Sequence, residues 1–169
     1  MEEAGYQLRP AVPADVDGIR RSIRFTLANP EGKAQRKQYG DAVDRHEILV
    51  VARHDPREEA DEISGFLEWH TKVDGAITIR DAGTSGDEPH LGTLRRLIRE
   101  LLHMFDPPSA SVKVRSDLTA WNEVFQQVPG FGLSGREYSR PHWRNIWEWT
   151  RESERAATRV SDARFRRRP

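Results

Sequence analysis

The fold is decided by the stretch Ser111-Val-Lys-Val-Arg115, which is followed by Ser116-Asp-Leu-Thr-Ala-Trp-Asn122 and then by Val128-Pro-Gly-Phe131. Its apolar start predicts a short strand. The middle predicts a short helix through Phe125, and we expect Trp121 and Phe125 to pack that helix against a sheet. After the Gly-Phe pair the sequence predicts two aromatic strands, one near Glu137 and one over residues 145–149.

The sequence before this stretch predicts six more elements. Val16, Ile19, Ile23 and Leu27 recur three and four positions apart, which predicts a helix with one apolar face. A continuous apolar run at 48–52 is typical of a strand buried on both faces. The predicted elements are, in order, strand 6–9, helix 13–29, strand 48–52, strand 62–72, strand 76–80 and helix 87–105.

Three local features qualify this outline. Asp74-Gly75 is a strong hairpin signal between the strands at 62–72 and 76–80. The polar segment from Glu31 to Arg45 predicts either a weak surface helix or a mobile loop, and Gly83-Thr-Ser-Gly86 is expected to end the strand before it. Alternation along strand 62–72 predicts two faces, with Ile63, Leu67 and Trp69 on one and Phe66, Glu68 and His70 on the other.

Composition limits the function classes. The 169 residues fit one domain, and 27 basic residues balance 27 acidic ones, so no overall charge drives binding to nucleic acid or membrane. There is no cysteine, which excludes disulfides, thiol catalysis and thiolate zinc sites. The absence of an apolar run of eighteen residues and of a basic, apolar leader predicts a cytoplasmic protein.

Two short motifs frame the predicted elements over residues 6–149: the opening Tyr6-Gln-Leu-Arg-Pro-Ala-Val-Pro-Ala-Asp-Val-Asp-Gly-Ile19 and the closing Gly130-Phe131. Together with the order of the elements, they resemble the GNAT superfamily of acyl-CoA-dependent N-acetyltransferases. The resemblance implies an α/β fold, a mixed and largely antiparallel sheet flanked by helices. It implies a GNAT-like domain at 1–150, followed by an Arg-rich tail at 151–169. The implied reaction moves an acetyl group from acetyl-CoA to a primary amine on a small molecule or peptide, with the thioester arm in a cleft between strands that splay near Arg80 and Val112.

The resemblance places the CoA phosphates at the start of the helix at 87–105, because helix N-termini favour anions. The family pattern, Arg/Gln-x-x-Gly-x-Gly/Ala, falls on Pro89-His-Leu-Gly92-Thr-Leu94, where only Gly92 fits. Asp87 and Glu88 stabilise the helix start but repel a pyrophosphate, so ordinary capping acids on a core helix are the alternative. The implied cofactor-binding residues are Ile79, Ala82, Gly83, Gly86, Gly92, Thr93 and Asn122.

Catalytic roles also follow from the resemblance. Gln126 stands where many members have a tyrosine acid, and an amide cannot give up a proton at useful pH. Protonation of the CoA thiolate would then need water or another group such as Tyr138, whose alternative role is a half-buried sheet aromatic. Glu68 and His70 are the candidate general bases. The alternatives for Glu68 are a solvated sheet face or a cross-strand pair with Arg80.

Other functions remain open in the sequence. The six histidines form no metal motif, so we expect no metal. A GNAT-like binding or assembly module without transferase activity is the main rival. The last nineteen residues hold seven Arg and three acids, so a third hypothesis is a nucleic-acid-associated protein acting through this tail. Trp147 and Trp149 share a strand face, which predicts a core or homodimer contact.

Overall fold

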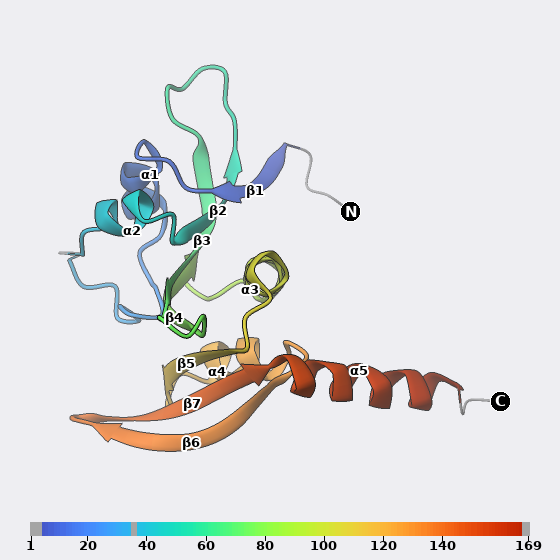
Figure 1. The fold of residues 1–169 in the computed structure, drawn as a ribbon. Coiled ribbons are helices and arrows are strands. Elements are labelled where there is room, and N and C mark those ends of the chain that lie inside the picture. The colour runs from blue at the N-terminus through green and yellow to red at the C-terminus, as the bar shows by residue number, and fades with distance from the viewer. Residues whose placement is uncertain (1–4, 35–36, 167–169) are drawn as a thin grey trace. The chain divides into compact units, whose positions relative to one another are not determined.

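The computed structural model describes residues 5–34 and 37–166, with side chains up to residue 161. In chain order its elements are β1 (Tyr6–Pro10), α1 (Asp15–Ser22), α2 (Gly40–Asp44), β2 (Ile48–Arg53), β3 (Glu62–Thr71), β4 (Ile77–Thr84), α3 (Leu91–Phe105), β5 (Ser109–Arg115), α4 (Thr119–Gln126), β6 (Phe131–Ser139), β7 (His142–Thr150) and α5 (Arg151–Arg166) (Figure 1). They belong to two compact units. The first comprises the chain up to His70 together with Ile79–Leu101, and the second comprises Thr71–Thr78 and the chain from Leu102.

The described strands form a mixed, mostly antiparallel sheet with helices on its faces, which confirms the predicted fold class. Hydrogen bonds link the strands in the order β1-β2-β3-β4-β5-β7-β6. The parallel step between β4 and β5 is short, since it pairs only Ile77 with Ala110 and Thr78 with Ser111. Arg80 and Val112, where the sequence predicts splaying, lie beyond this ladder.

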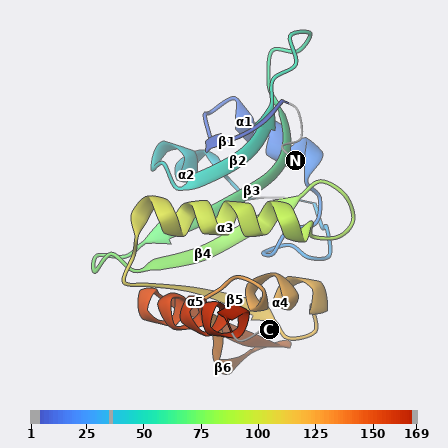
Figure 2. The same ribbon diagram turned by 90° about the vertical axis from the view of Figure 1, so that its right-hand side faces the viewer.

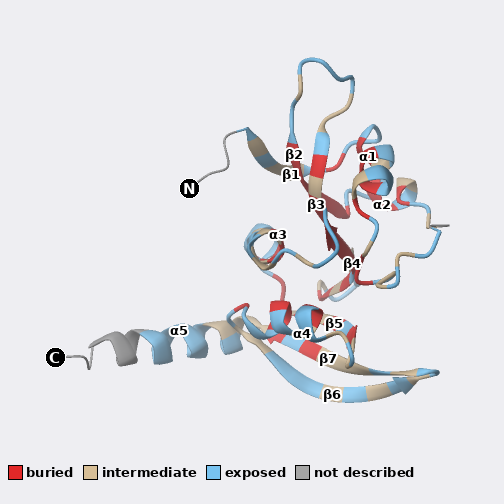
Figure 3. Cartoon of the chain, turned by 180° about the vertical axis from the view of Figure 1, so that it is seen from behind, coloured by how far each residue is buried: buried red, intermediate tan, exposed pale blue. Residues whose placement is uncertain are grey.

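Apolar packing in the first unit joins α1 and α2 to one face of β2 and β3. Ile19, Ile23, Val50 and Phe66 belong to one cluster of buried side chains. Close approach is possible because α1 carries Gly18, where a Cβ would lie 2.9 Å from Ile63 Cγ1. The buried stretches of β2, β3 and β4 stand out in Figure 3, and Figure 2 shows α3 lying along the sheet in front of β3 and β4.

The first helix is shorter than its apolar spacing predicts. α1 ends at Ser22, and Ile23 is extended with φ −124°. Leu27 is still buried, but it lies outside the helix. Its N–H donates to the Ala82 carbonyl on β4 at 2.8 Å. The prediction of a helix to Asn29 was therefore wrong, since β4 competes for the backbone groups that a longer helix would use.

The predicted faces of the strand at 62–72 also need correction. β2 and β3 change register between Val51 and Ala52, which pair with Gly65 and Ile63 respectively. The intervening Ser64 is a bulge, and a bulge moves the residues beyond it to the opposite face. Ile63 accordingly packs in the same cluster as Phe66 rather than on the opposite face.

The segment between α1 and β2 is mostly irregular. Only Gly40–Asp44 is helical, and residues 35 and 36 lie outside the described part. The Asp74-Gly75 turn is confirmed, with Gly75 at φ +87° and the Lys72 N–H bonded to the Ala76 carbonyl at 2.8 Å. β4 continues to Thr84, so Gly83 does not break the strand as predicted.

The second unit packs α4 on the sheet formed by β5, β7 and β6. Trp121 and Phe125 of α4 are buried as predicted. Trp147 and Trp149 are also buried, which confirms their place in the core. α5 follows β7 directly, and residues 167–169 of the Arg-rich tail lie outside the described part. Within the described ranges, no helix has the length and apolar character needed to cross a bilayer.

Charged contacts fasten β1 to the start of α1. The Arg9 guanidinium donates to both oxygens of Asp15, at 2.7 and 3.0 Å, and to Asp61 at 2.8 Å. Asp15 also accepts the Val12 N–H at 2.8 Å. Side-chain hydrogen bonds with Arg9, and to a lesser extent with His54, lower the pKa of Asp61 below its usual range.

Replacing Asp61 by Asn should reduce stability in a pH-dependent way. A carboxylate with a lowered pKa stabilises the folded state above its unfolded pKa, and this contribution is lost as pH falls through the folded pKa. We expect a loss of about 1 kcal/mol at about pH 7, shrinking toward zero in strong acid. Thermal unfolding from neutral to acid pH measures it, with exposed Glu58→Gln as the matched control. A difference that persists in strong acid would contradict the prediction.

Candidate active site

A fully buried carboxylate, Asp81 on β4, organises the polar groups of the first unit. Its Oδ1 accepts the N–H groups of Ala28 at 3.0 Å and of Ala82 at 2.9 Å. Its Oδ2 accepts the Tyr39 hydroxyl at 3.0 Å and the Lys37 ammonium at 3.1 Å. Four donors compensate the desolvation of this charge, so the segment between α1 and α2 is tied to β4.

Glu68, the first candidate base, shares its counter-ion with Asp81. The Lys37 Nζ lies 2.5 Å from Glu68 Oε1 and 3.1 Å from Asp81 Oδ2. The Glu68 side chain is only 6% exposed, so the alternative of a solvated sheet face is wrong. Its ion-pair partner is Lys37 rather than Arg80, which corrects the cross-strand alternative.

His70, the other candidate base, is held by a different acid. Its Nδ1 lies 3.3 Å from Glu47 Oε2, and Glu47 also pairs with Arg45 at 2.7 Å. Its side chain is 42% exposed. The two candidate bases therefore have different ion-pair partners, although they lie on the same strand.

One edge of β4 is partly covered by the chain itself. Thr26 forms an antiparallel bridge with Gly83, and the Ala82 carbonyl accepts the Leu27 N–H at 2.8 Å. β3 occupies the opposite edge of β4, so the 26–28 stretch lies along the edge that β3 leaves open. Ala82 and Gly83, two of the predicted pantetheine contacts, already have partners there, whereas Ile79 precedes this covered part.

The turn from β4 to α3 is held by Thr84 and His90. Thr84 Oγ1 accepts the His90 N–H at 2.9 Å, and the His90 ring accepts the Thr93 N–H at 3.1 Å. The imidazole thus caps the helix and takes one of the N–H groups predicted to meet phosphate. Gly86, at φ +101°, faces open space, and Gly92 is exposed in the first turn of α3.

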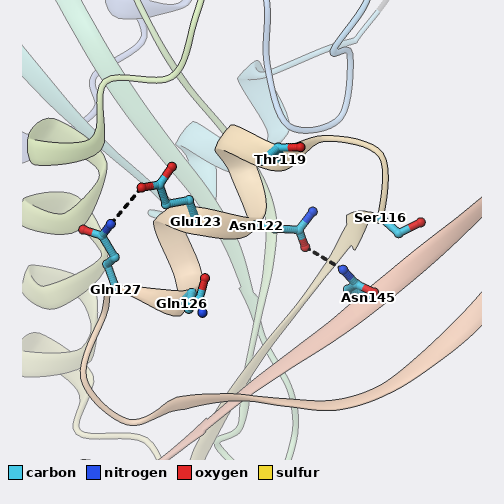
Figure 4. A pocket seen from close by; sticks show the side chains of 7 residues that line it. All are labelled: Ser116, Thr119, Asn122, Glu123, Gln126, Gln127 and Asn145. Carbon is cyan, nitrogen blue, oxygen red and sulfur yellow. Dashed lines mark hydrogen bonds between the residues drawn. The ribbon is translucent and has the colours of Figure 1, made fainter.

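A polar pocket of about 580 Å³ lies in the second unit, against α4 (Figure 4). Most of its lining side chains are amides or hydroxyls, with one carboxylate, Glu123. Such a lining suits an uncharged ligand that both donates and accepts hydrogen bonds. The lining residues are Ser116, Thr119, Asn122, Glu123, Gln126, Gln127 and Asn145.

Both polar atoms of the Asn122 side chain in this pocket already form hydrogen bonds within the protein. Its Nδ2 donates to the carbonyls of Arg115 and Leu118, both at 2.9 Å. Its Oδ1 accepts Asn145 Nδ2 and Trp147 Nε1, both at 2.9 Å. The side chain joins α4 to β5 and β7, so its predicted cofactor contact would have to replace one of these bonds.

Gln126, at the position of the family's tyrosine acid, and Tyr138, the candidate for thiolate protonation, occupy different places in the second unit. Gln126 lines the pocket and is exposed on α4. Tyr138 is 57% exposed, so it is not half-buried as the alternative proposed, and its ring lies 5.4 Å from that of Trp143 near the end of the β6–β7 hairpin. Tyr138 does not line the pocket that holds Gln126.

Sequence reasoning missed Lys37, Tyr39 and Asp81. Each lies in a polar stretch or beside another charge, and neither pattern distinguishes a buried ion pair from a solvated one. An aspartate between Arg80 and Ala82 in an apolar strand was the one available signal. In the described part of the chain, no three His, Asp or Glu residues are grouped so that they could hold a metal ion.

Asn122→Ala should destabilise the second unit by about 2–3 kcal/mol, because it leaves the buried Trp147 N–H without an acceptor. Gln126→Ala on the same helix should stay within about 0.5 kcal/mol of the parent chain. Urea unfolding measures both. Adding Trp147→Phe to Asn122→Ala should cost less than the sum of the single changes, and full additivity would contradict the assigned bond.

No protein-family model matches the chain, and no curated protein sequence matches it. Several solved structures share its fold. A GNAT-family acetyltransferase from Bacillus cereus ATCC 10987 superposes with a TM-score of 0.64 at 17% identity, over 86% of this chain and 96% of its own. A candidate streptothricin acetyltransferase from Bacillus anthracis str. Ames, complexed with acetyl coenzyme A, gives 0.66 at 13% identity, over 86% and 98%.

A third similar structure is the spermidine N-acetyltransferase of Vibrio cholerae in complex with CoA and spermine. It superposes with a TM-score of 0.63 at 12% identity, over 90% of this chain and 99% of its own. Sequence identity is low in all three cases, while the matched region spans nearly the whole of each structure. The likeness therefore concerns the fold, and this chain has the fold of the GNAT-family acetyltransferases.

Proposed function

We propose that this chain is an N-acetyltransferase that moves an acetyl group from acetyl-CoA to a primary amine. The observation that carries the proposal is a buried carboxylate, Glu68, in contact with a primary ammonium, Lys37 Nζ, on a GNAT fold. The similar structures from Bacillus anthracis and Vibrio cholerae contain acetyl coenzyme A and CoA respectively, which supports the choice of co-substrate.

Glu68 acts in this proposal as the general base. An amine must lose a proton to attack a carbonyl carbon, and a carboxylate within hydrogen-bond reach can accept it. Acetyl-CoA would supply the acetyl group as a thioester. The new C–N bond forms as the C–S bond breaks, Glu68 holds the amine proton, and water returns a proton to the thiolate. His70, with its Glu47 partner, is the alternative base.

The residues proposed to hold the co-substrate in the first unit come from β4 and the start of α3. Ile79, before the covered part of the β4 edge, is the predicted backbone contact for the pantetheine arm. Gly86 leaves room for phosphate, since a Cβ there would meet nothing within 4 Å, whereas a Cβ at Gly92 would lie 3.3 Å from His90 Cε1. In the second unit, Gln126 lines the amide-rich pocket, where its side chain can both donate and accept a hydrogen bond.

Glu68→Gln should lower kcat for acetyl transfer by roughly 10²- to 10⁴-fold, because the amide cannot accept the proton. Its affinity for acetyl-CoA should remain that of the parent chain. Glu62→Gln, on the same strand but exposed, is the matched control and should keep its activity. A coupled assay of released CoA measures turnover and calorimetry measures binding. Full activity of Glu68→Gln would contradict the role of Glu68.

Removing the acids before α3 should tighten acetyl-CoA binding. Asp87 and Glu88 are exposed near the start of α3, where they repel a pyrophosphate. We expect Asp87→Asn with Glu88→Gln to lower the Kd about 3- to 10-fold at low salt, with a smaller gain at high salt.

Glu58→Gln with Glu59→Gln removes two exposed acids from the turn before β3 and is the matched control for that change. Calorimetry at two salt concentrations compares the pairs. An equal effect of both pairs would place the phosphates away from the start of α3.

A second candidate function is a binding module with the GNAT fold but without transfer activity. It is favoured by the Ala82 carbonyl and the Thr93 N–H, which the chain itself already binds. Acetyl-CoA should raise the melting temperature of a transferase, since it binds the folded state only. No shift at millimolar acetyl-CoA would favour the module. The tail hypothesis gains no support, because the side chains beyond residue 161 lie outside the described part.

A further inference from the structure

We propose that Glu68, Asp81 and the ring of Tyr39 form a binding site for an alkylammonium group, which Lys37 fills from within the chain. This deepens the proposed function, on which it rests, by naming the acceptor as an alkylamine that carries a positive charge at neutral pH. It also makes Lys37 an internal competitor of that acceptor.

The composition of the site matches an ammonium ion. Two carboxylates lie within 3.1 Å of the Lys37 nitrogen, and both are almost completely buried. The same nitrogen lies 5.1 Å from the centroid of the Tyr39 ring. Carboxylates on one side and an aromatic face on another are the groups that recognise organic cations.

The two carboxylates depend on Lys37 to different degrees. Asp81 keeps three other donors, from Ala28, Ala82 and Tyr39, if Lys37 leaves. Glu68 Oε1 contacts Lys37 as an ion pair and has no hydrogen bond of good geometry within the described residues. Glu68 therefore offers the acceptor oxygen to which a replacement cation would donate a hydrogen bond, and it is also the proposed base.

Lys37 provides the route into the site. Its side chain is 31% exposed, whereas Glu68 is 6% and Asp81 0% exposed. The lysine stem thus leads from solvent to buried carboxylates, and its removal leaves a passage with the width of an alkyl chain.

The test is chemical rescue of Lys37→Ala by propylammonium, which replaces the atoms that the substitution removes. We expect Lys37→Ala to lower the Tm by about 10 °C, because a buried carboxylate loses its counter-ion. Propylammonium at millimolar concentration should restore about half of the loss in a saturable way, by binding the folded state. Tetramethylammonium, which has the charge but no N–H donor, should restore little.

Two variants serve as controls. Lys33 pairs with Glu31 on the surface and is 77% exposed, so Lys33→Ala should show neither the loss nor the rescue. Adding Glu68→Gln to Lys37→Ala should abolish the rescue, because the amide no longer attracts a cation. If Lys37→Ala does not fold alone, recovery of the fold is measured in each salt instead.

The outcomes separate this inference from the proposed function. Rescue needs no acetyl-CoA, so it tests the ammonium site alone, while acetyl transfer to propylamine tests the enzyme. If both hold, the KM for propylamine should be several-fold lower in Lys37→Ala than in the parent chain. Equal effects of propylammonium and tetramethylammonium, or equal effects on Lys33→Ala, would overturn the site.

Discussion

The burial of one charge, Asp81, is the constraint on which the candidate acceptor site depends. A carboxylate without exposure must be surrounded by donors, and here they come from Ala28, Ala82, Tyr39 and Lys37. Three of these belong to the irregular segment between α1 and β2. That segment has one short helix of its own, so its path is set by β4 rather than by local propensity.

The same constraint places a cation beside Glu68. Because Asp81 and Glu68 share Lys37, the fold brings a base candidate and an ammonium together without any bound substrate. The Lys37 ammonium and the Glu68 carboxylate lie as a protonated amine and its base would lie before proton transfer. The acceptor chemistry that we propose thus has a counterpart among the side chains of the protein itself.

Elsewhere, groups expected to serve the co-substrate also serve the fold. Asn122 joins α4 to two strands through three of its four hydrogen bonds, and the His90 ring caps α3 through the Thr93 N–H. Each bond stabilises the protein by keeping a polar group paired in a partly buried place. If the protein is a transferase, it must bind acetyl-CoA through polar groups that do not take part in these hydrogen bonds.

Much of the fold could be predicted because it rests on local patterns. The apolar stripe of α3, the Asp74-Gly75 turn and the buried run of β2 each specify an element without knowledge of its neighbours. The end of α1 and the faces of β3 could not, because they depend on a backbone bond to Ala82 and on a bulge at Ser64. Long-range pairing leaves no periodic trace in a sequence.

The candidate site was predictable only in part, for the same reason. Glu68 stood out by its strand position, but its partner Lys37 lies thirty-one residues earlier in a polar segment. Asp81 gave a weak signal, a charge within an otherwise apolar strand. Which charges meet is decided by the tertiary fold, and alternation along β3 favoured Arg80 because cross-strand neighbours are the only partners that a single sequence suggests.

Amide hydrogen exchange at Leu27 and Ala28 tests the central constraint most directly. If Asp81 fastens this stretch to β4, both amides are protected although they lie outside any helix or strand. The protection of Ala28 should then disappear in Asp81→Ala while that of the β2 amides persists. Exchange of both amides in the parent chain as fast as in an open loop would contradict the account.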